Sequence, residues 1–234
     1  MKRKILTAAL VLAMSAVAFT GCGSDDNDTP AITQVPTTTP EATTTTAAVD
    51  TTAGATVAMS NITRGTWENG VWSSEYLGIS FNLPEGWVTT TDAEMAANLS
   101  LGMDIFDLGV ELDDFQLLPD MGAQDPMTGD NVQVLIERLD PAVANITAAE
   151  YAELASMGIE MLGGEVTFGH PSVTIGGQEW YVVGTFLDFG GGIAAAGRQL
   201  INVEDGFARL IIITHMTDDA SNTATMYDII ANFN

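Results

Sequence analysis

AAAGRQLINVEDGFARLIIITHM, residues 194–216, contains the clearest structural signal in this chain. Residues 194–203 and 207–216 are two strand-length segments rich in apolar residues, and Asp205-Gly206 stands between them. Asp-Gly between such segments is a strong signal for a β-hairpin closed by a type I′ turn. Leu210–Ile213 is apolar at every position, so we expect this strand to be central in its sheet and covered on both faces.

A second hairpin is expected directly before this one. Residues 166–175 and 179–187 have the composition of strands, and Gly176-Gly177 fits a two-residue turn between them. Gly190–Gly192 then forms a loose connection to the hairpin that follows. After the last strand, four apolar residues line one face of a C-terminal helix: Met226, Ile229, Ile230 and Phe233.

The chain before residue 140 also favours strands. Residues 71–76 and 78–83 read as two short strands, followed by the turn Pro84–Gly86 and by Trp87-Val88. Residues 132–139 predict a strand with one apolar face, formed by Val132, Val134 and Ile136. Between these parts we expect a strand near 115–118 and then a long loop, because four residues interrupt the pattern: Pro119, Gly122, Pro126 and Gly129.

Two helices are announced by capping boxes. In Thr91–Glu94 and in Thr147–Glu150, a threonine precedes a glutamate by three positions, so each side chain can bond the backbone N–H of the other residue. Apolar residues follow each box at helical spacing. They are Met95, Leu99 and Met103 after the first box, and Tyr151, Leu154, Gly158, Met161 and Leu162 after the second. Gly163-Gly164 ends the second helix.

These elements predict an α+β fold. We expect an antiparallel meander sheet of about six to seven strands, with helices packed on its faces. Residues 65–234 form one domain in this interpretation, because about 170 residues suffice for one core and no internal repeat or second boundary is visible.

The N-terminus has the features of a bacterial secretory leader. Lys2, Arg3 and Lys4 precede the apolar run Ile5–Phe19, which is too short to span a hydrocarbon core of about 30 Å. The run ends in Phe19-Thr20-Gly21-Cys22, which resembles the lipobox of bacterial lipoproteins, although Phe19 replaces the usual leucine. In that family the cysteine is the lipid attachment site, so we predict a signal peptide at 1–21 and lipid on Cys22. The alternative is a plain secreted protein with an unmodified thiol.

A linker is expected at residues 22–64. It is first acidic and then rich in threonine and proline, with almost no large apolar residues, so it cannot offset its own ordering entropy. We expect it to be disordered and to hold the domain away from the membrane. An O-glycosylated stalk is the alternative.

The charge of the chain excludes several partners. The leader contains Lys2, Arg3 and Lys4, and removing it leaves four arginines against 31 acidic residues, a formal charge of −27. Nucleic-acid binding needs cations to neutralise phosphates, so we predict no nucleic-acid partner. Docking on anionic lipid headgroups is disfavoured for the same reason. The membrane is therefore a partner only through the N-terminal lipid.

The run YLGISFNLPEGW, residues 76–87, resembles the opening of domains in the PsbP-like superfamily. The Asp-Gly hairpin and a closing helix that ends in a phenylalanine are further points of resemblance. The resemblance covers roughly residues 67–234 and implies an α+β fold of the type found in many lipoproteins of Gram-positive bacteria. It implies no enzyme activity and supplies no catalytic residues, and the better-known members are accessory and binding proteins.

Residues that could carry chemistry are few. His170 and His215 are isolated, and a Ser–His–acid site needs spatial evidence, because such triads are not sequential. No zinc-ligand spacing is present, and we predict no cofactor. Calcium has two candidate acidic sets, neither of which fits an EF-hand loop: Asp107, Glu111, Asp113 and Asp114, and separately Asp125 with Asp130. Four tryptophans could form a binding platform if exposed, but core packing is the alternative: Trp67, Trp72, Trp87 and Trp180.

The function predicted from sequence is that of a lipid-anchored lipoprotein on the extracellular face of the cell membrane, with a non-catalytic binding or accessory domain. Its partner would be an unidentified protein or carbohydrate. Two alternatives remain open. One is a secreted hydrolase that uses carboxylates or His215, and the other is a calcium-dependent surface module.

Overall fold

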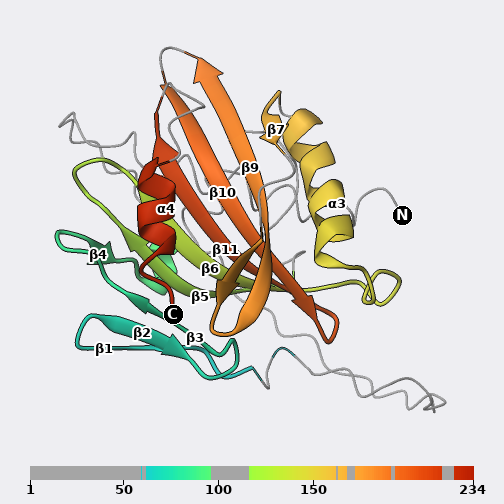
Figure 1. Cartoon of the computed structure of the whole chain (residues 1–234), viewed down its shortest axis with the longest axis horizontal. Coiled ribbons are helices and arrows are strands. Elements are labelled where there is room, and N and C mark those ends of the chain that lie inside the picture. Colours follow the sequence, from blue (N-terminus) through green and yellow to red (C-terminus); the bar gives the residue numbers. More distant parts are fainter. Residues whose placement is uncertain are drawn as a thin grey trace, which may run out of the picture.

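The computed structural model describes residue 59 and residues 62–95, 116–161, 163–167, 172–190, 193–217 and 224–234. The fold is α+β, as predicted (Figure 1). Its strands are β1 (Thr66–Glu68), β2 (Val71–Ser74), β3 (Ile79–Asn82), β4 (Val88–Thr89), β5 (Leu117–Gln124), β6 (Asn131–Arg138), β7 (Glu165–Thr167), β8 (Val173–Ile175), β9 (Gln178–Gly190), β10 (Ile193–Glu204) and β11 (Phe207–Met216). The longer helices are α3 (Ala148–Met161) and α4 (Ala224–Ile230).

The large sheet has the strand order β4-β5-β6-β11-β10-β9-β7, and β8 pairs with β9 outside this path. All its described pairings are antiparallel. β9, β10 and β11 form the predicted meander. β6, in contrast, lies beside β11, although four strands separate them in the sequence, so the sheet departs from a simple meander at this point.

The hairpin of β10 and β11 closes through the predicted turn. Asp205 has φ 53° and Gly206 has φ 80°, the two positive values that a type I′ turn needs. Glu204 lies opposite Phe207, so the turn contains two residues. β11 has β10 on one side and β6 on the other, and Leu210–Ile213 is buried throughout. The prediction of a central strand covered on both faces is therefore confirmed.

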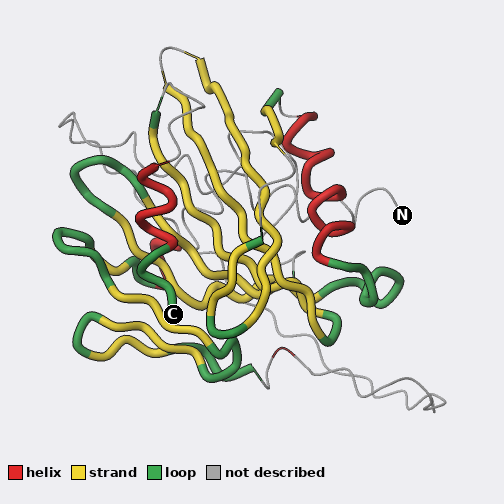
Figure 2. The backbone as a smooth tube through the Cα atoms, in the orientation of Figure 1, coloured by secondary structure: helices red, strands yellow, loops and turns green. Residues whose placement is uncertain are grey.

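A second, three-stranded sheet lies beside the large one, with the order β1-β2-β3 (Figures 1 and 2). The C-terminus joins it, because Ser80 and Asn234 exchange backbone hydrogen bonds of 2.9 Å in both directions. Phe233 forms an isolated bridge with Phe81 instead of continuing α4, which corrects the predicted helical position of Phe233. The two rings lie 4.6 Å apart between centroids.

Two predicted strands differ from the structure. The segment predicted as one strand at 166–175 is divided into β7 and β8, which pair with different parts of β9: Thr167 lies opposite Gly184, and Val173 lies opposite Trp180. The strand predicted near 115–118 is β5, which continues through the expected loop to Gln124. Pro119 is accommodated next to a β-bulge between Pro119 and Met121.

Both capping boxes form as predicted. The Thr147 backbone N–H donates to the Glu150 carboxylate at 2.7 Å, and the Glu150 N–H donates to Thr147 Oγ1 at 3.2 Å. Thr91 and Glu94 make the same reciprocal bonds. α3 ends where Gly163 takes φ +81° and the Gly164 N–H donates to the Ile159 carbonyl at 2.9 Å. Leu99, Met103 and Leu162 lie outside the described residues.

The core has two layers, one on each face of the large sheet. One layer contains side chains of the small sheet and of α4, packed against alternate residues such as Ile211 and Ile213 of β11. The other contains α3 residues such as Tyr151 and Ala155, packed against Leu210 and the residues that share its face. Within the described part of the chain, neither helix has the length and apolar character needed to cross a bilayer.

Candidate functional site

Several residues predicted from sequence lie outside the part of the chain that the structure describes. These are Cys22, His170, Asp107, Glu111, Asp113 and Asp114. His215, Asp125, Asp130 and the four tryptophans are described.

Asp125 and Asp130, the second calcium candidate, have separate roles. Asp125 closes the turn between β5 and β6, because its Oδ1 accepts the Met127 N–H at 2.8 Å and its carbonyl accepts the Gly129 N–H at 2.9 Å. Asp130 instead lies against His215. Among the described residues, no group of three or more His, Cys, Asp or Glu side chains is placed to hold a metal ion.

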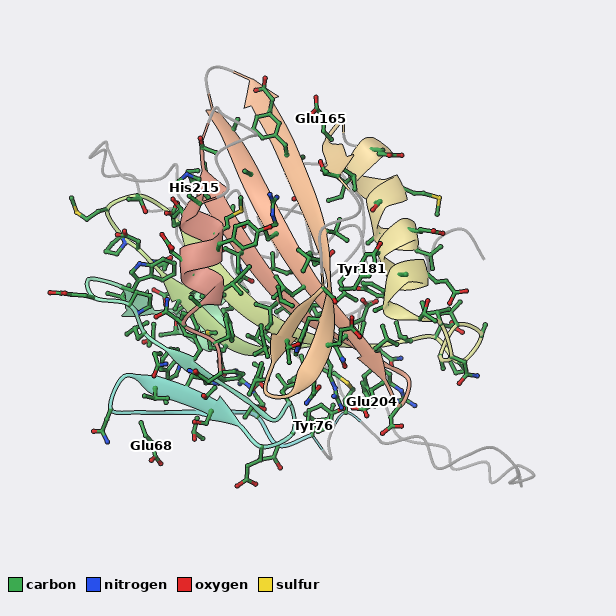
Figure 3. The ribbon with its side chains drawn as sticks, viewed as in Figure 1. Glu68, Tyr76, Glu165, Tyr181, Glu204 and His215 are labelled. Carbon is green, nitrogen blue, oxygen red and sulfur yellow. The ribbon has the colours of Figure 1, made fainter. Side chains whose placement is uncertain are left out.

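Asp130 and His215 form a hydrogen-bonded pair at one end of the large sheet. Nδ1 of His215 lies 2.7 Å from Oδ1 of Asp130, and the same oxygen accepts the Met216 N–H at 3.3 Å. The side chains are 13% and 6% exposed. This contact fixes the orientation of the imidazole ring. Figure 3 shows His215 at the opposite end of the β10–β11 hairpin from Glu204.

Arg198 lies on the same face of the sheet as His215, on the neighbouring strand β10. It is opposite Ile213 of β11 and Gly184 of β9, and its neighbour Ala196 is opposite His215. Paired residues share a face and faces alternate along a strand, so Arg198 and His215 project to the same side. Diagonal neighbours of this kind are about 7–8 Å apart.

The environment of Arg198 is unusual for a cation. The residue is only 5% exposed. One Nη1 hydrogen bond of 3.0 Å reaches the carbonyl of the preceding Gly197, and Nε has no hydrogen-bond partner among the described residues. No ion pair joins Arg198 to a carboxylate within the described part of the chain, and Gly184 beside it carries no side chain.

Two other arginines show the arrangement that Arg198 lacks. Arg209, also 5% exposed, lies 2.5 Å from a Glu204 carboxylate oxygen, and its guanidinium is 5.1 Å from the centre of the Tyr76 ring. Arg64 makes two hydrogen bonds of 2.7 and 2.8 Å to Asp92. Arg209 and Glu204 belong to the β10–β11 hairpin, and Figure 3 labels Glu204 and Tyr76 at the same end of the molecule.

The tryptophans do not form an exposed platform. Trp72 and Trp180 are fully buried in the core. Trp67 and Trp87 are partly buried and pack against the same cluster, with Trp67 edge-on to Phe81 at 6.3 Å between ring centroids. The platform hypothesis is therefore wrong for Trp72 and Trp180, and core packing, the alternative, is what the fold uses.

Glu137 is a buried acid that the sequence pattern does not reveal. Its carboxylate accepts a 2.5 Å hydrogen bond from the Tyr151 hydroxyl, between β6 and α3. Burial raises the pKa of Glu137 to about 7, and the hydrogen bond from Tyr151 only partly opposes this. The site lies on the sheet face opposite to Arg198, because Glu137 pairs with Ala208 and Arg198 pairs with Ile213.

The fold and the site define an α+β protein with helices on both faces of an antiparallel sheet and a buried cation near a His–Asp pair. No family model and no curated protein matches the chain. A search of solved structures returns similar folds. Cyanobacterial PsbP from Synechocystis aligns with 13% identity and a TM-score of 0.42, over 77% of this chain and 98% of that one.

Two further solved structures are also similar. LpqN, involved in cell envelope biogenesis of Mycobacterium tuberculosis, aligns with 15% identity and a TM-score of 0.41, over 66% of this chain and 78% of that one. A protein from Bacteroides thetaiotaomicron aligns with 11% identity and a TM-score of 0.36, and the chain spans 44% of its length.

Proposed function

We propose that this chain is a lipid-anchored binding protein of the bacterial cell surface. In this proposal residues 1–21 are removed, Cys22 carries the lipid, residues 22–64 are the linker, and residues 65–234 form the binding domain. The leader-like run Ile5–Phe19 followed by Gly21-Cys22 supports the anchor. Two acyl chains are sufficient for stable anchoring without a membrane-spanning helix.

One observation carries the binding part of the proposal. Arg198 is buried without a carboxylate partner among the described residues, on the face that also holds the Asp130–His215 pair. A structural arginine would be expected to resemble Arg209, which has Glu204 and Tyr76 around it. A buried polar group that the fold leaves unpaired is a feature of binding sites, where the ligand completes the hydrogen bonds.

The anchor is tested by labelling growing cells with radioactive palmitate. The native chain and a Ser24→Ala control should incorporate label, and Cys22→Ala should not, because it has no thiol to receive the lipid. The Cys22→Ala protein should also be released into the medium, and protease added to intact cells should degrade the native protein. Label on the Cys22→Ala chain, or an unlabelled native chain, would remove the anchor from the proposal.

A hydrolase that uses His215 is a second candidate, because Asp130 orients the imidazole as an acid orients a catalytic base. This candidate is tested with the mature Cys22→Ala chain on panels of ester, peptide and glycan substrates. A binding protein should turn over none of them. Turnover that is lost in His215→Gln and retained in the exposed-surface control Tyr227→Phe would instead establish the hydrolase.

A further inference from the structure

Arg198 differs from Arg64 and Arg209 in the charges that surround it. The mature chain contains four arginines and 31 acidic residues, so a carboxylate partner is abundant for any cation. Arg64 has Asp92, and Arg209 has Glu204. Arg198 is as buried as Arg209, and no described carboxylate pairs with it. The absence of an acid here runs against the composition of the whole chain.

Burial makes this absence costly. A charge removed from water without a partner loses its hydration, and the Gly197 carbonyl is a neutral acceptor that replaces only part of it. The Nε–H groups of Arg64, Arg198 and Arg209 all lack a hydrogen-bond partner among the described residues, so the missing carboxylate is what distinguishes Arg198. An oxyanion bound to the guanidinium would provide both the opposite charge and the acceptors for its parallel N–H groups.

The side chains beside Arg198 on this face of the sheet are small or apolar, apart from His215. Gly184, directly opposite Arg198 on β9, has no side chain, and Ala196 and Leu200 flank Arg198 on the same face of β10. His215 is the polar neighbour on β11, held in one orientation by Asp130. This face of the sheet therefore presents the Arg198 guanidinium and the His215 imidazole among apolar side chains.

We propose that Arg198 is the anchor of a binding site for an organic anion with a single oxyanion group, a carboxylate or a phosphate ester. This inference deepens the binding part of the proposed function and rests on it. The charge of −27 repels polyanions, whereas a ligand with one anionic group and an apolar remainder faces little repulsion at physiological salt, where charges are screened beyond about 8 Å. Acetate and inorganic phosphate are the minimal probes of the two sources, and tripolyphosphate represents the polyanions.

The test follows the arginine Nε–Hε signals by NMR in the full mature chain, with Cys22→Ala to prevent lipidation. Only four such signals exist, and Arg198→Lys identifies the one of interest. Acetate or phosphate, added at constant ionic strength against chloride, should shift the Arg198 signal saturably. The signals of Arg64 and Arg209 should not follow the same curve, and tripolyphosphate should bind at least tenfold more weakly. The probe that binds more tightly distinguishes a carboxylate ligand from a phosphate ester.

Two variants complete the experiment. Arg198→Met should lose the rise in melting temperature that the tighter probe produces and should weaken binding at least tenfold, because charge-assisted hydrogen bonds are lost. Arg138→Met, a matched change on β6, should leave both unchanged. An Arg198 signal that no probe shifts saturably would overturn the proposal, as would unchanged binding in Arg198→Met. The NMR titration tests ligand binding even if Arg198→Met does not fold. Palmitate labelling tests the lipid attachment at Cys22 separately.

Discussion

Glu137 shows how a single residue can make stability depend on pH. Its carboxyl group is buried between β6 and α3 and has the Tyr151 hydroxyl as its hydrogen-bond donor. Burial disfavours the charged form and raises the pKa of Glu137 from 4.5 to about 7. A raised pKa means that the folded state binds the proton more tightly than the unfolded state. This contribution to stability is fully present below pH 4.5 and is lost as the pH rises through about 7.

The pH dependence can be measured with Glu137→Gln, which removes the titration and keeps an acceptor for Tyr151. Between pH 5 and pH 8, the free energy of unfolding of the native chain should fall by about 2–3 kcal/mol relative to that of Glu137→Gln. Urea unfolding at the two pH values measures this difference. Glu160→Gln, an exposed change on α3, the helix that contains Tyr151, should follow the native chain. If the free energies of unfolding of the native chain and of Glu137→Gln differed by the same amount at both pH values, the raised pKa of Glu137 would be contradicted.

Arg198 and Glu137 were not predicted from sequence, although both belong to correctly predicted strands. Each is a charged residue within a strand whose neighbours are apolar, and such residues can face solvent in an amphipathic strand. Their burial depends on what covers each face of the sheet, such as α3 over Glu137. His215 and Asp130, in contrast, were both singled out, but for different sites: 85 residues separate them, and only the pairing of β11 with β6 brings them together.

For helices, strands and turns, a prediction was correct where the interactions that form the element join residues close together in the sequence. The Asp205-Gly206 turn and the two capping boxes were predicted correctly, because their hydrogen bonds join residues at most a few positions apart. The predicted strand near 115–118 is shorter than β5, because a proline such as Pro119 usually indicates the end of a strand. Pro119 pairs with β6 on one side only, while β4 reaches just Ala123 and Gln124 on the other side. A proline is tolerated at such an edge.

The pairing of β9 with β10 depends on a close contact that can be tested. A Cβ atom at Gly197 would lie 2.3 Å from Oγ1 of Thr185, the residue opposite it. Gly197→Ala should therefore destabilise the protein by about 1–3 kcal/mol, since overpacking moves side chains or strands. Chemical unfolding of the purified variant measures the loss.

The double variant Gly197→Ala/Thr185→Ala separates this clash from a general effect of alanine. Removing Oγ1 leaves the Thr185 Cβ as the nearest atom of residue 185, at 3.7 Å, which is an ordinary contact. The double variant should therefore recover at least about 1 kcal/mol relative to the sum of the single changes. Strictly additive effects would show that the contact does not limit the pairing.

At the scale of the whole molecule, the negative charge is the dominant property. A formal charge of −27 after removal of the leader favours solubility and opposes compaction through self-repulsion. Salt screens this repulsion, so the melting temperature should rise between 10 and 300 mM NaCl, by roughly 2–4 °C for each kcal/mol of repulsion removed. Differential scanning calorimetry of the mature Cys22→Ala chain measures the rise, and a constant or falling value would contradict it.

The same measurement tests the calcium-dependent alternative. MgCl2 and CaCl2 at equal ionic strength should shift the melting temperature alike if screening alone acts. A specific calcium site would add about 2.7 kcal/mol at 100 times its Kd, and this increment would appear with calcium only. Asp125 and Asp130 are engaged in the turn and with His215, so we expect no calcium increment from them.

The α+β class, the central hairpin, the helix caps and the charge could all be predicted from the amino-acid sequence, because each follows from local geometry, from apolar periodicity or from composition. It also predicted the lipid anchor at Cys22, which the palmitate experiment tests. Three features could be seen only in the folded chain: β1–β3 form a separate sheet, Trp72 and Trp180 lie in the core, and β6 pairs with β11. These outcomes depend on contacts between residues far apart in the chain, and the burial of Arg198 beside Gly184 and near His215 is one of them.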